Sequence, residues 1–260
     1  MCKFLLQHVT IPISLFQSTL PTNTNNKKNK KINNNSTDTE TESTQALSTK
    51  EIHKQLASTT FDASKLQNIT TIRLNNVKSL TAINFDLLLN AFPVTNSLHL
   101  RNNAIAGGKL ETVNTTLCHL NLANNCLTTC GNSLHLLQQL TILSLHGNKL
   151  TEINDGLLKL TTLTELNIAH NKISSIPQQL GESLQSLKIL NVSKNQITSL
   201  PNSILTISTL QSLCVSYNPL NEFFPTISTI KSTSLHDINL KKVALKSIPN
   251  NLPTSLTKLC

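Results

Sequence analysis

The sequence LCHLNLANNCL, residues 117–127, returns with little change further along the chain. The same eleven-residue frame, L-x-x-L-x-L-x-x-N-x-L, reappears as LTILSLHGNKL from Leu140, LTELNIAHNKI from Leu163, LKILNVSKNQI from Leu187 and LQSLCVSYNPL from Leu210. Residues are numbered below by their frame position, from 1 to 11. Asparagines at frame position 9 recur every 22 to 24 residues, at Asn103, Asn125, Asn148, Asn171, Asn195 and Asn218. A fixed period of this length indicates a chain of stacked structural repeats.

A second column of residues keeps the same phase. Four prolines stand 24 residues apart, each after an apolar residue: Pro177, Pro201, Pro225 and Pro249. Weaker copies of the frame begin at Ile69 and Leu235, with Val77 and Val243 in place of the asparagine. Two columns in phase make a chance pattern implausible, and the prolines predict where each repeat leaves its strand on the outer side.

The frame itself predicts a short, half-buried strand. Frame positions 4 and 6 are apolar and alternate with polar neighbours, which is the period-two pattern of a strand with one buried face. Stacked coils can bury their leucines together, whereas a single coil cannot. Each asparagine at position 9 lies where the chain leaves the strand, and its amide can pair backbone groups of its own and the next coil. We expect a structural asparagine ladder, and loss of one member to cost roughly 1–3 kcal/mol.

The frame resembles the leucine-rich repeat, and the x-x-L-P-x-x-L returns resemble those of Ras-pathway and phosphatase-regulating repeat proteins. The resemblance covers residues 69–260, about eight repeats and a truncated ninth. It implies an α/β solenoid, a curved horseshoe with parallel strands on its concave face. It also implies a non-catalytic scaffold or adaptor in intracellular signalling that binds another protein on that face.

Two segments precede the repeats. Residues 1–47 include a stretch rich in Asn, Lys, Ser and Thr that cannot bury enough apolar surface to fold, so a disordered arm is expected. Its basic run 27–31 is solvated, acts as a nuclear signal or binds an acidic surface. Residues 48–68 open with a capping-box pair, Ser48 and Glu51, which predicts a helix that covers the first coil.

The cysteines and the N-terminus favour a cytoplasmic or nuclear location. The first twenty residues lack both an uninterrupted apolar core and a cleavage site, so secretion or mitochondrial import is not expected. The six cysteines do not cluster at the ends of the repeats, which favours reduced thiols. Cys118, His119, Cys126 and Cys130 lack zinc-ligand spacing, so no metal or other cofactor is expected.

No catalytic motif occurs, so the candidate site is the exposed side of the strands, at frame positions 3, 5, 7 and 8. Four histidines from successive coils could lie in one band that senses pH or holds a metal, or could simply be tolerated polar residues. Tyr217, beside Lys194 and Lys242, is the expected hot spot. The candidate partner-binding residues are Arg73, His99, Arg101, His119, Asn121, Ser144, His146, Glu165, Asn167, His170, Asn191, Lys194, Tyr217, Asn239 and Lys241.

Three alternatives remain open. The net charge of +9 allows RNA binding, although exposed aromatic residues for base stacking are scarce. The chain could be the recognition segment of a larger kinase, GTPase or ubiquitin ligase. The frame that begins at Leu256 stops at Cys260, which would leave leucines uncovered unless they pair with a partner or with a second copy end to end.

Overall fold

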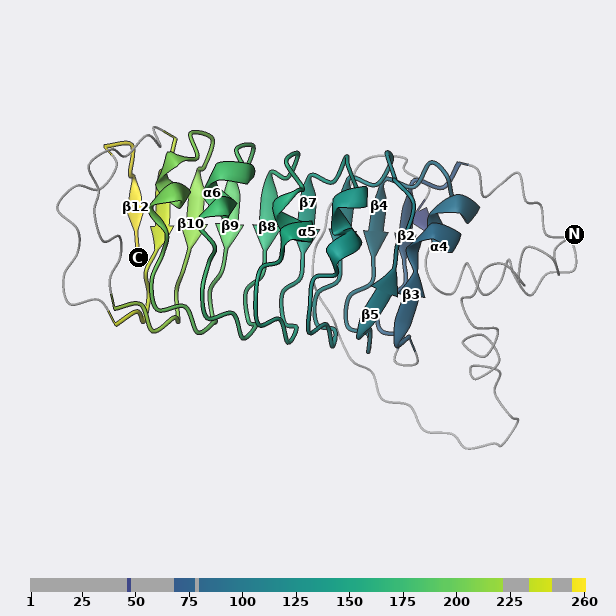
Figure 1. The fold of residues 1–260 in the computed structure, drawn as a ribbon, viewed down its shortest axis with the longest axis horizontal. Coiled ribbons are helices and arrows are strands. Elements are labelled where there is room, and N and C mark those ends of the chain that lie inside the picture. The colour runs from purple at the N-terminus through teal and green to yellow at the C-terminus, as the bar shows by residue number, and fades with distance from the viewer. Residues whose placement is uncertain (1–45, 48–67, 78–79, 222–233, 245–253) are drawn as a thin grey trace, which may run out of the picture.

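The computed structural model describes residues 46–47, 68–77, 80–221, 234–244 and 254–260. Ten short strands stack in sequence order into one parallel sheet, as Figure 1 shows from end to end. The strands are β1 (Ala46–Leu47), β2 (Thr71–Arg73), β4 (Ser97–His99), β6 (His119–Asn121), β7 (Ile142–Ser144), β8 (Glu165–Asn167), β9 (Ile189–Asn191), β10 (Ser212–Cys214), β11 (Asp237–Asn239) and β12 (Lys258–Leu259). The predicted parallel α/β solenoid is confirmed.

The register explains why each strand is so short. Frame position 4 of one repeat pairs with position 4 of the next, as Leu120 does with Leu143 and Leu143 with Leu166. Only frame positions 3 to 5 are extended, because the chain then turns back to close its coil. The eight strands from β2 to β11 in this sheet therefore contribute three residues each at the same height, and the end strands β1 and β12 contribute two.

The return segments on the outer side vary from repeat to repeat. They contain a longer helix near the N-terminal end of the sheet and single turns further on: α4 (Phe85–Ala91), η2 (Asn132–Leu136), α5 (Asp155–Leu158), α6 (Gln179–Ser183) and η3 (Asn202–Thr206). The helix α4 ends two residues before Pro93. Figure 1 shows these turns side by side in front of the strands. A second, two-stranded parallel sheet joins β3 (Ala82–Asn84) to β5 (Gly107–Lys109).

Helix packing on the outer side is tight enough to require glycine. A Cβ on Gly181, in α6, would lie 2.1 Å from the carbonyl oxygen of Ser203 in the next return segment. The backbone of one return therefore touches the backbone of the next, which keeps the outer layer in step with the sheet.

The core lies between the sheet and the return segments. Leucines and isoleucines at frame positions 1, 4, 6 and 11 are almost wholly buried; those of the repeat from Leu163, namely Leu163, Leu166, Ile168 and Ile173, are at most 1% exposed. Each repeat places the same four side chains at the same height, so one apolar column runs through the described coils.

The asparagines at position 9 join neighbouring coils through the backbone. Asn171, for example, donates from Nδ2 to the carbonyl oxygens of Leu145 and Ile168, and its Oδ1 accepts from the Leu150 N–H. The same three bonds recur at 2.6–3.0 Å for the other five ladder members, with Val77 as the donor to Asn103. Backbone groups that a three-residue strand leaves unpaired are thereby satisfied.

The N-terminal end differs from the expected boundaries in one respect. Ala46 and Leu47, assigned above to the arm, pair in parallel with Thr71 and Ile72 and so extend the sheet by one strand. The predicted capping helix of residues 48–68 and the basic run 27–31 lie outside the described residues, apart from Asn68. In the part of the chain that the structure describes, no helix has the length and apolarity to cross a membrane.

Candidate functional site

The surface of the ten-stranded sheet that faces away from the core and the return segments is called the strand face below. It is made by four parallel rows of side chains. Frame positions 4 and 6 point into the core, so positions 3 and 5 point away from it, as their burial patterns show. Positions 7 and 8 follow immediately where the chain leaves the strand. With strands about 4.8 Å apart and residues about 3.3 Å apart, the strand face measures about 43 Å by 13 Å across rows 3 to 7.

Row 5 runs along the middle of the strand face and is half-buried throughout. Its described members are Arg73, His99, Asn121, Ser144, Asn167, Asn191, Cys214 and Asn239. In four repeats its asparagine Oδ1 accepts a hydrogen bond from the backbone N–H two residues later; Asn167, for example, accepts from Ala169 at 3.2 Å. These asparagines hold the turn after the strand with one end of the amide and present the other end to the surface.

Row 7 corrects one expectation from the sequence. Position 7 was expected to be exposed in every repeat, yet its small residues are at most 8% exposed, at Ala123, Ala169, Ser193 and Ser216. A small side chain ends close to the backbone, where longer neighbours shield it. The longer members of this row reach solvent: Arg101 and Lys241 are exposed, and Asn75 and His146 are half-buried.

Row 8 has one unusual backbone conformation in all eight described repeats. Its residues have φ between 53° and 68°, in the left-handed region: Asn76, Asn102, Asn124, Gly147, His170, Lys194, Tyr217 and Lys242. Only Asn and Gly adopt this region readily, so the four bulky residues are strained there individually. The stacked coil imposes the conformation, and it aims every row 8 side chain outward at the edge of the strand face.

The first half of row 8 is an outer amide ladder. Asn102 Nδ2 donates to Asn76 Oδ1 at 3.0 Å, and Asn124 Nδ2 donates to Asn102 Oδ1 at 2.8 Å. Gly147 ends this ladder, because a Cβ there would lie 2.1 Å from Asn124 Oδ1. The glycine therefore accommodates both the positive φ and the asparagine side chain of the preceding repeat.

The second half of row 8 is aromatic and basic. His170 stacks on His146 of the preceding repeat, with ring centroids 5.8 Å apart and planes inclined by 25°. Tyr217 receives the ammonium of Lys194 at 5.7 Å and that of Lys242 at 5.3 Å from its ring centroid. These side chains, with Lys241 of row 7, form what we call the cationic ridge.

Positive charge surrounds His146 on the ridge. Burial lowers the pKa of His146, and the nearby positive charges of His170, Arg101 and Lys194 lower it further, against a hydrogen bond with the Ala169 backbone that raises it. The positively charged neighbours act over several repeats, because Arg101 and Lys194 belong to different coils. This environment favours the neutral imidazole.

The four histidines do not share one band. His99 belongs to row 5, where its Nε2 lies 3.0 Å from Oγ of Ser97 in row 3. His119 belongs to row 3, and only His146 and His170 are in contact. No group of three or more His, Cys, Asp or Glu residues with metal-binding geometry occurs among the described residues. The structure brings together one histidine pair of the predicted four.

Row 3, at the opposite edge of the strand face, has a different character. Glu165 stands between Ile142 and Ile189 in the neighbouring strands, and the Ile189 side chain is 40% exposed. Asp237 pairs with Lys258 of the next strand at 3.7 Å. Sequence reasoning named His119 and Glu165 here but missed the two isoleucines. An apolar residue at a position that is polar in other repeats is the signal that could have identified them.

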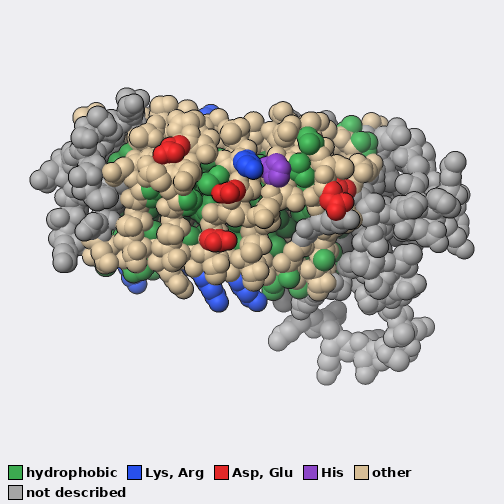
Figure 2. All heavy atoms as spheres, viewed as in Figure 1, with side chains coloured by type: hydrophobic (Ala, Val, Ile, Leu, Met, Phe, Trp, Pro, Cys, Tyr) green, Lys and Arg blue, Asp and Glu red, His purple; other side chains and the backbone are tan. Residues whose placement is uncertain are grey.

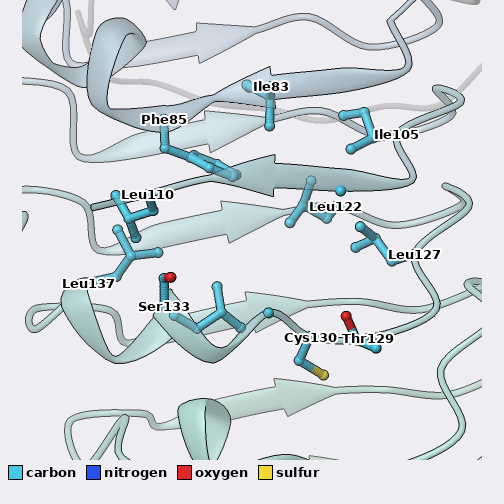
Figure 3. A pocket seen from close by; sticks show the side chains of 13 residues that line it. Ile83, Phe85, Ile105, Leu110, Leu122, Leu127, Thr129, Cys130, Ser133 and Leu137 are labelled. Carbon is cyan, nitrogen blue, oxygen red and sulfur yellow. The ribbon is translucent and has the colours of Figure 1, made fainter. Parts of the chain in front are cut away.

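The cysteines that were weighed as zinc ligands lie apart from the strand face. Cys118, Cys126 and Cys130 are free thiols, and burial, followed by the charge of Glu152, raises the pKa of Cys130 to about 12. Cys130 lines an apolar cavity of about 130 Å³ between the sheet and the return segments, shown in Figure 3. A thiol with so high a pKa is a poor ligand and a poor nucleophile at neutral pH.

The outer, helix-bearing side offers no comparable surface. Figure 2 shows that side with a few separate acidic side chains, isolated basic ones and small apolar areas among uncharged atoms. Side chains of one charge do not gather on it. The strand face is therefore the candidate site.

The comparisons with known proteins agree with the repeat geometry. Residues 161–220 match the family described as leucine rich repeat. No curated protein matches the chain.

Three solved structures share the fold. The structure of TLR13 with ssRNA13 matches with a TM-score of 0.62 and 24% identity over 76% of this chain and 29% of that chain. Internalin C2 from Listeria monocytogenes matches with a TM-score of 0.62 and 22% identity, over 76% of this chain and 83% of that chain. The third structure is the leucine-rich repeat ectodomain of the Arabidopsis thaliana receptor kinase GASSHO1/SCHENGEN3, in complex with CASPARIAN STRIP INTEGRITY FACTOR 2. It matches with a TM-score of 0.55 and 25% identity, over 69% of this chain and 25% of that chain.

This chain thus spans less than a third of the first and third of these structures. The repeated frame, the stacked coils and the matches together identify the fold as a leucine-rich repeat solenoid, and the family match itself covers residues 161–220.

Proposed function

We propose that this chain is a non-catalytic scaffold that binds another protein across its strand face. The observation that carries the proposal is that each repeat uses some frame positions for the core and others for the surface. Positions 1, 4, 6, 9 and 11 are used for the core and the ladder, whereas rows 3, 5 and 8 vary, with five or six residue types in each row over the eight described repeats. Solenoids with extended repeated surfaces are built for recognition of large partners.

The size of the strand face suits a protein partner. A face of about 43 Å by 13 Å exposes roughly 560 Å² in projection, and side-chain relief raises the accessible area toward the ~800 Å² per partner of a standard interface. Tyr217, 38% exposed and held by two lysines, is a rigid anchor of the kind that dominates such interfaces.

A cytoplasmic role in signalling is the finer part of the proposal. It rests on the resemblance of the x-x-L-P-x-x-L returns to Ras-pathway and phosphatase-regulating proteins and on the unclustered cysteines. The free thiols of the described residues are compatible with a reducing compartment.

The main alternative is a recognition segment within a larger signalling enzyme. The match to a receptor-kinase ectodomain of which this chain spans 25% favours that alternative. Recognition through the strand face is common to both, so the test below applies to either.

The test combines capture with footprinting. The tagged chain is used to isolate partners from its own cells with nuclease present, and hydrogen exchange then maps protection on the purified complex. We expect protection on β6 to β11, and loss of the complex in the triple variant His146→Ala, Asn167→Ala and Tyr217→Ala.

A matched triple variant on the helix-bearing side controls for general destabilisation. His135→Ala, Lys159→Ala and Gln179→Ala lie in or beside η2, α5 and α6 and should leave the complex intact. Protection confined to the return segments, or full binding by the strand-face variant, would exclude the proposal.

A further inference from the structure

The two edges of the strand face differ in charge. Rows 7 and 8 contain no Asp or Glu in any of the eight described repeats, and they contain Arg101, Lys194, Lys241 and Lys242. The acidic residues of the strand face, Glu165 and Asp237, both stand in row 3. Asp237 is already paired with Lys258. Positive charge is therefore concentrated along one edge and is not neutralised by side chains of rows 7 and 8.

The side chains of the cationic ridge lie next to one another. His146 contacts His170, and Lys194 and Lys242 both contact Tyr217, across repeats four to eight. Lysines that rest against an aromatic ring lose part of their freedom before a partner arrives, so less conformational entropy is lost on binding. The ridge is thus both basic and pre-organised.

We propose that the cationic ridge binds an extended acidic segment of the partner protein. The ridge spans four strand spacings from His146 to Lys242, about 19 Å, which matches about six residues of extended chain. Carboxylates along such a segment complement the three lysine ammonium groups. The inference rests on the proposed protein-binding function and adds the chemistry of the partner.

The geometry favours an acidic peptide over single-stranded nucleic acid. Base stacking needs an open aromatic face, whereas the ring of Tyr217 has a lysine from the preceding repeat and another from the following repeat. Glu165 and Asp237 in row 3 would also repel a second stretch of phosphates laid across the strand face. Peptide carboxylates can reach the lysines from the edge without displacing them from the ring.

The chain provides its own probe for the test. Tyr217 is the only tyrosine, and there is no tryptophan, so tyrosine fluorescence reports on the centre of the ridge. A twelve-residue peptide of alternating Glu and Ser has no aromatic side chain and can be titrated into the full chain at low salt. We expect a saturable change in Tyr217 fluorescence that weakens as salt is raised.

Two charge-matched variants locate the binding. Lys194→Gln with Lys242→Gln removes two charges from the ridge and keeps Tyr217. Lys149→Gln with Lys172→Gln removes two charges from exposed positions beyond the ladder asparagines. We expect the ridge variant to lose about tenfold or more in affinity and the control variant less than about twofold.

Several results would overturn the inference. They are an absence of saturable binding, an equal loss in both variants, or equal binding of the same peptide with Gln in place of Glu. A labelled twelve-nucleotide RNA of uridines, followed by anisotropy, is the competing probe; preferential RNA binding that the ridge variant abolishes would assign the ridge to nucleic acid.

The captured partner separates this inference from the proposed function. Suppose that the partner binds the ridge variant fully but is lost in the triple variant on the strand face. The scaffold function then stands, and the acidic-segment inference fails.

Discussion

Frame positions 8 and 9 are neighbours in the chain, yet the solenoid uses them in opposite ways. Position 9 is asparagine in six described repeats and makes the same three hydrogen bonds in each. Position 8 has the same left-handed backbone in eight repeats but five residue types, from Asn76 to Lys242. The backbone conformation repeats at both positions, but only the side chain that points inward has to be the same residue in each repeat.

The difference shows which positions of a repeat can vary and so determine what partner the chain recognises. A residue that pairs buried backbone groups cannot vary without leaving them unsatisfied. A residue held outward at an edge can be Asn, Gly, His, Lys or Tyr, because the coil and not the side chain fixes its φ. The predictions below test this contrast, in order of decreasing effect.

The largest effect is expected at position 9. Asn171→Leu leaves the buried Leu150 N–H without its acceptor and removes one of the two asparagine donors from each of the Leu145 and Ile168 carbonyl oxygens, which should cost about 3 kcal/mol of unfolding free energy. Urea unfolding followed by far-UV circular dichroism measures the loss. The control is Lys172→Gln at the exposed neighbouring position, which should change stability by less than about 0.5 kcal/mol. Similar losses in both variants would mean that the ladder does not hold the coils.

The next effect is expected at the glycine of row 8. Gly147→Ala introduces a side chain at φ 68° and a Cβ 2.1 Å from Asn124 Oδ1, which together should cost about 2 kcal/mol.

A double-mutant cycle separates the two causes. In an Asn124→Ala background the collision is gone and only the backbone strain, about 1 kcal/mol, should remain. An unchanged penalty in that background would show that the asparagine side chain simply moves aside.

Bulky members of row 8 should affect stability far less than ladder members. Lys194→Ala and Lys242→Ala each remove a lysine contact with Tyr217 at an exposed site, worth about 0.5–1 kcal/mol at most. Chemical denaturation of both single variants and the double variant gives the coupling. A loss as large as that of Asn171→Leu would erase the distinction between the two positions.

The smallest effect concerns pH. The pKa of His146 is lowered in the folded chain by burial and by the charges of His170, Arg101 and Lys194, so the unfolded chain binds its proton first as the solution is acidified. Stability supplied by the neutral imidazole is fully present above pH 6.5 and falls as pH drops below it. His146→Gln should flatten the slope of the unfolding midpoint between pH 7 and pH 5.

Its control is Ser144→Thr, a half-buried position of the strand face that has no titratable group. We expect the slope of this variant to stay close to that of the unmodified chain. A steeper decline of stability toward low pH in His146→Gln than in the unmodified chain would contradict the assignment.

The sequence predicted the interior better than the surface, for a physical reason. The side chain at a buried frame position contacts the same frame positions in every repeat. The spacing of Leu163, Leu166 and Asn171 is therefore enough to infer their environment. The exposure of a side chain in a surface row depends on whether its neighbours in adjacent repeats are long enough to cover it. The burial of Ala169 and Ser193, the contact of His146 with His170, and the apolar pair Ile142 and Ile189 therefore needed coordinates.

By itself the sequence determined the fold: a period of about 23 residues, with leucines and asparagines in phase, permits one way to bury the leucines and pair the backbone. The frame also placed Tyr217 beside Lys194 and Lys242, but tertiary structure alone decided that both ammonium groups lie over its ring and that positive charge collects along one edge. Those residues come from coils 23 to 25 positions apart, and only the stacking distance of the strands, about 4.8 Å, brings them together.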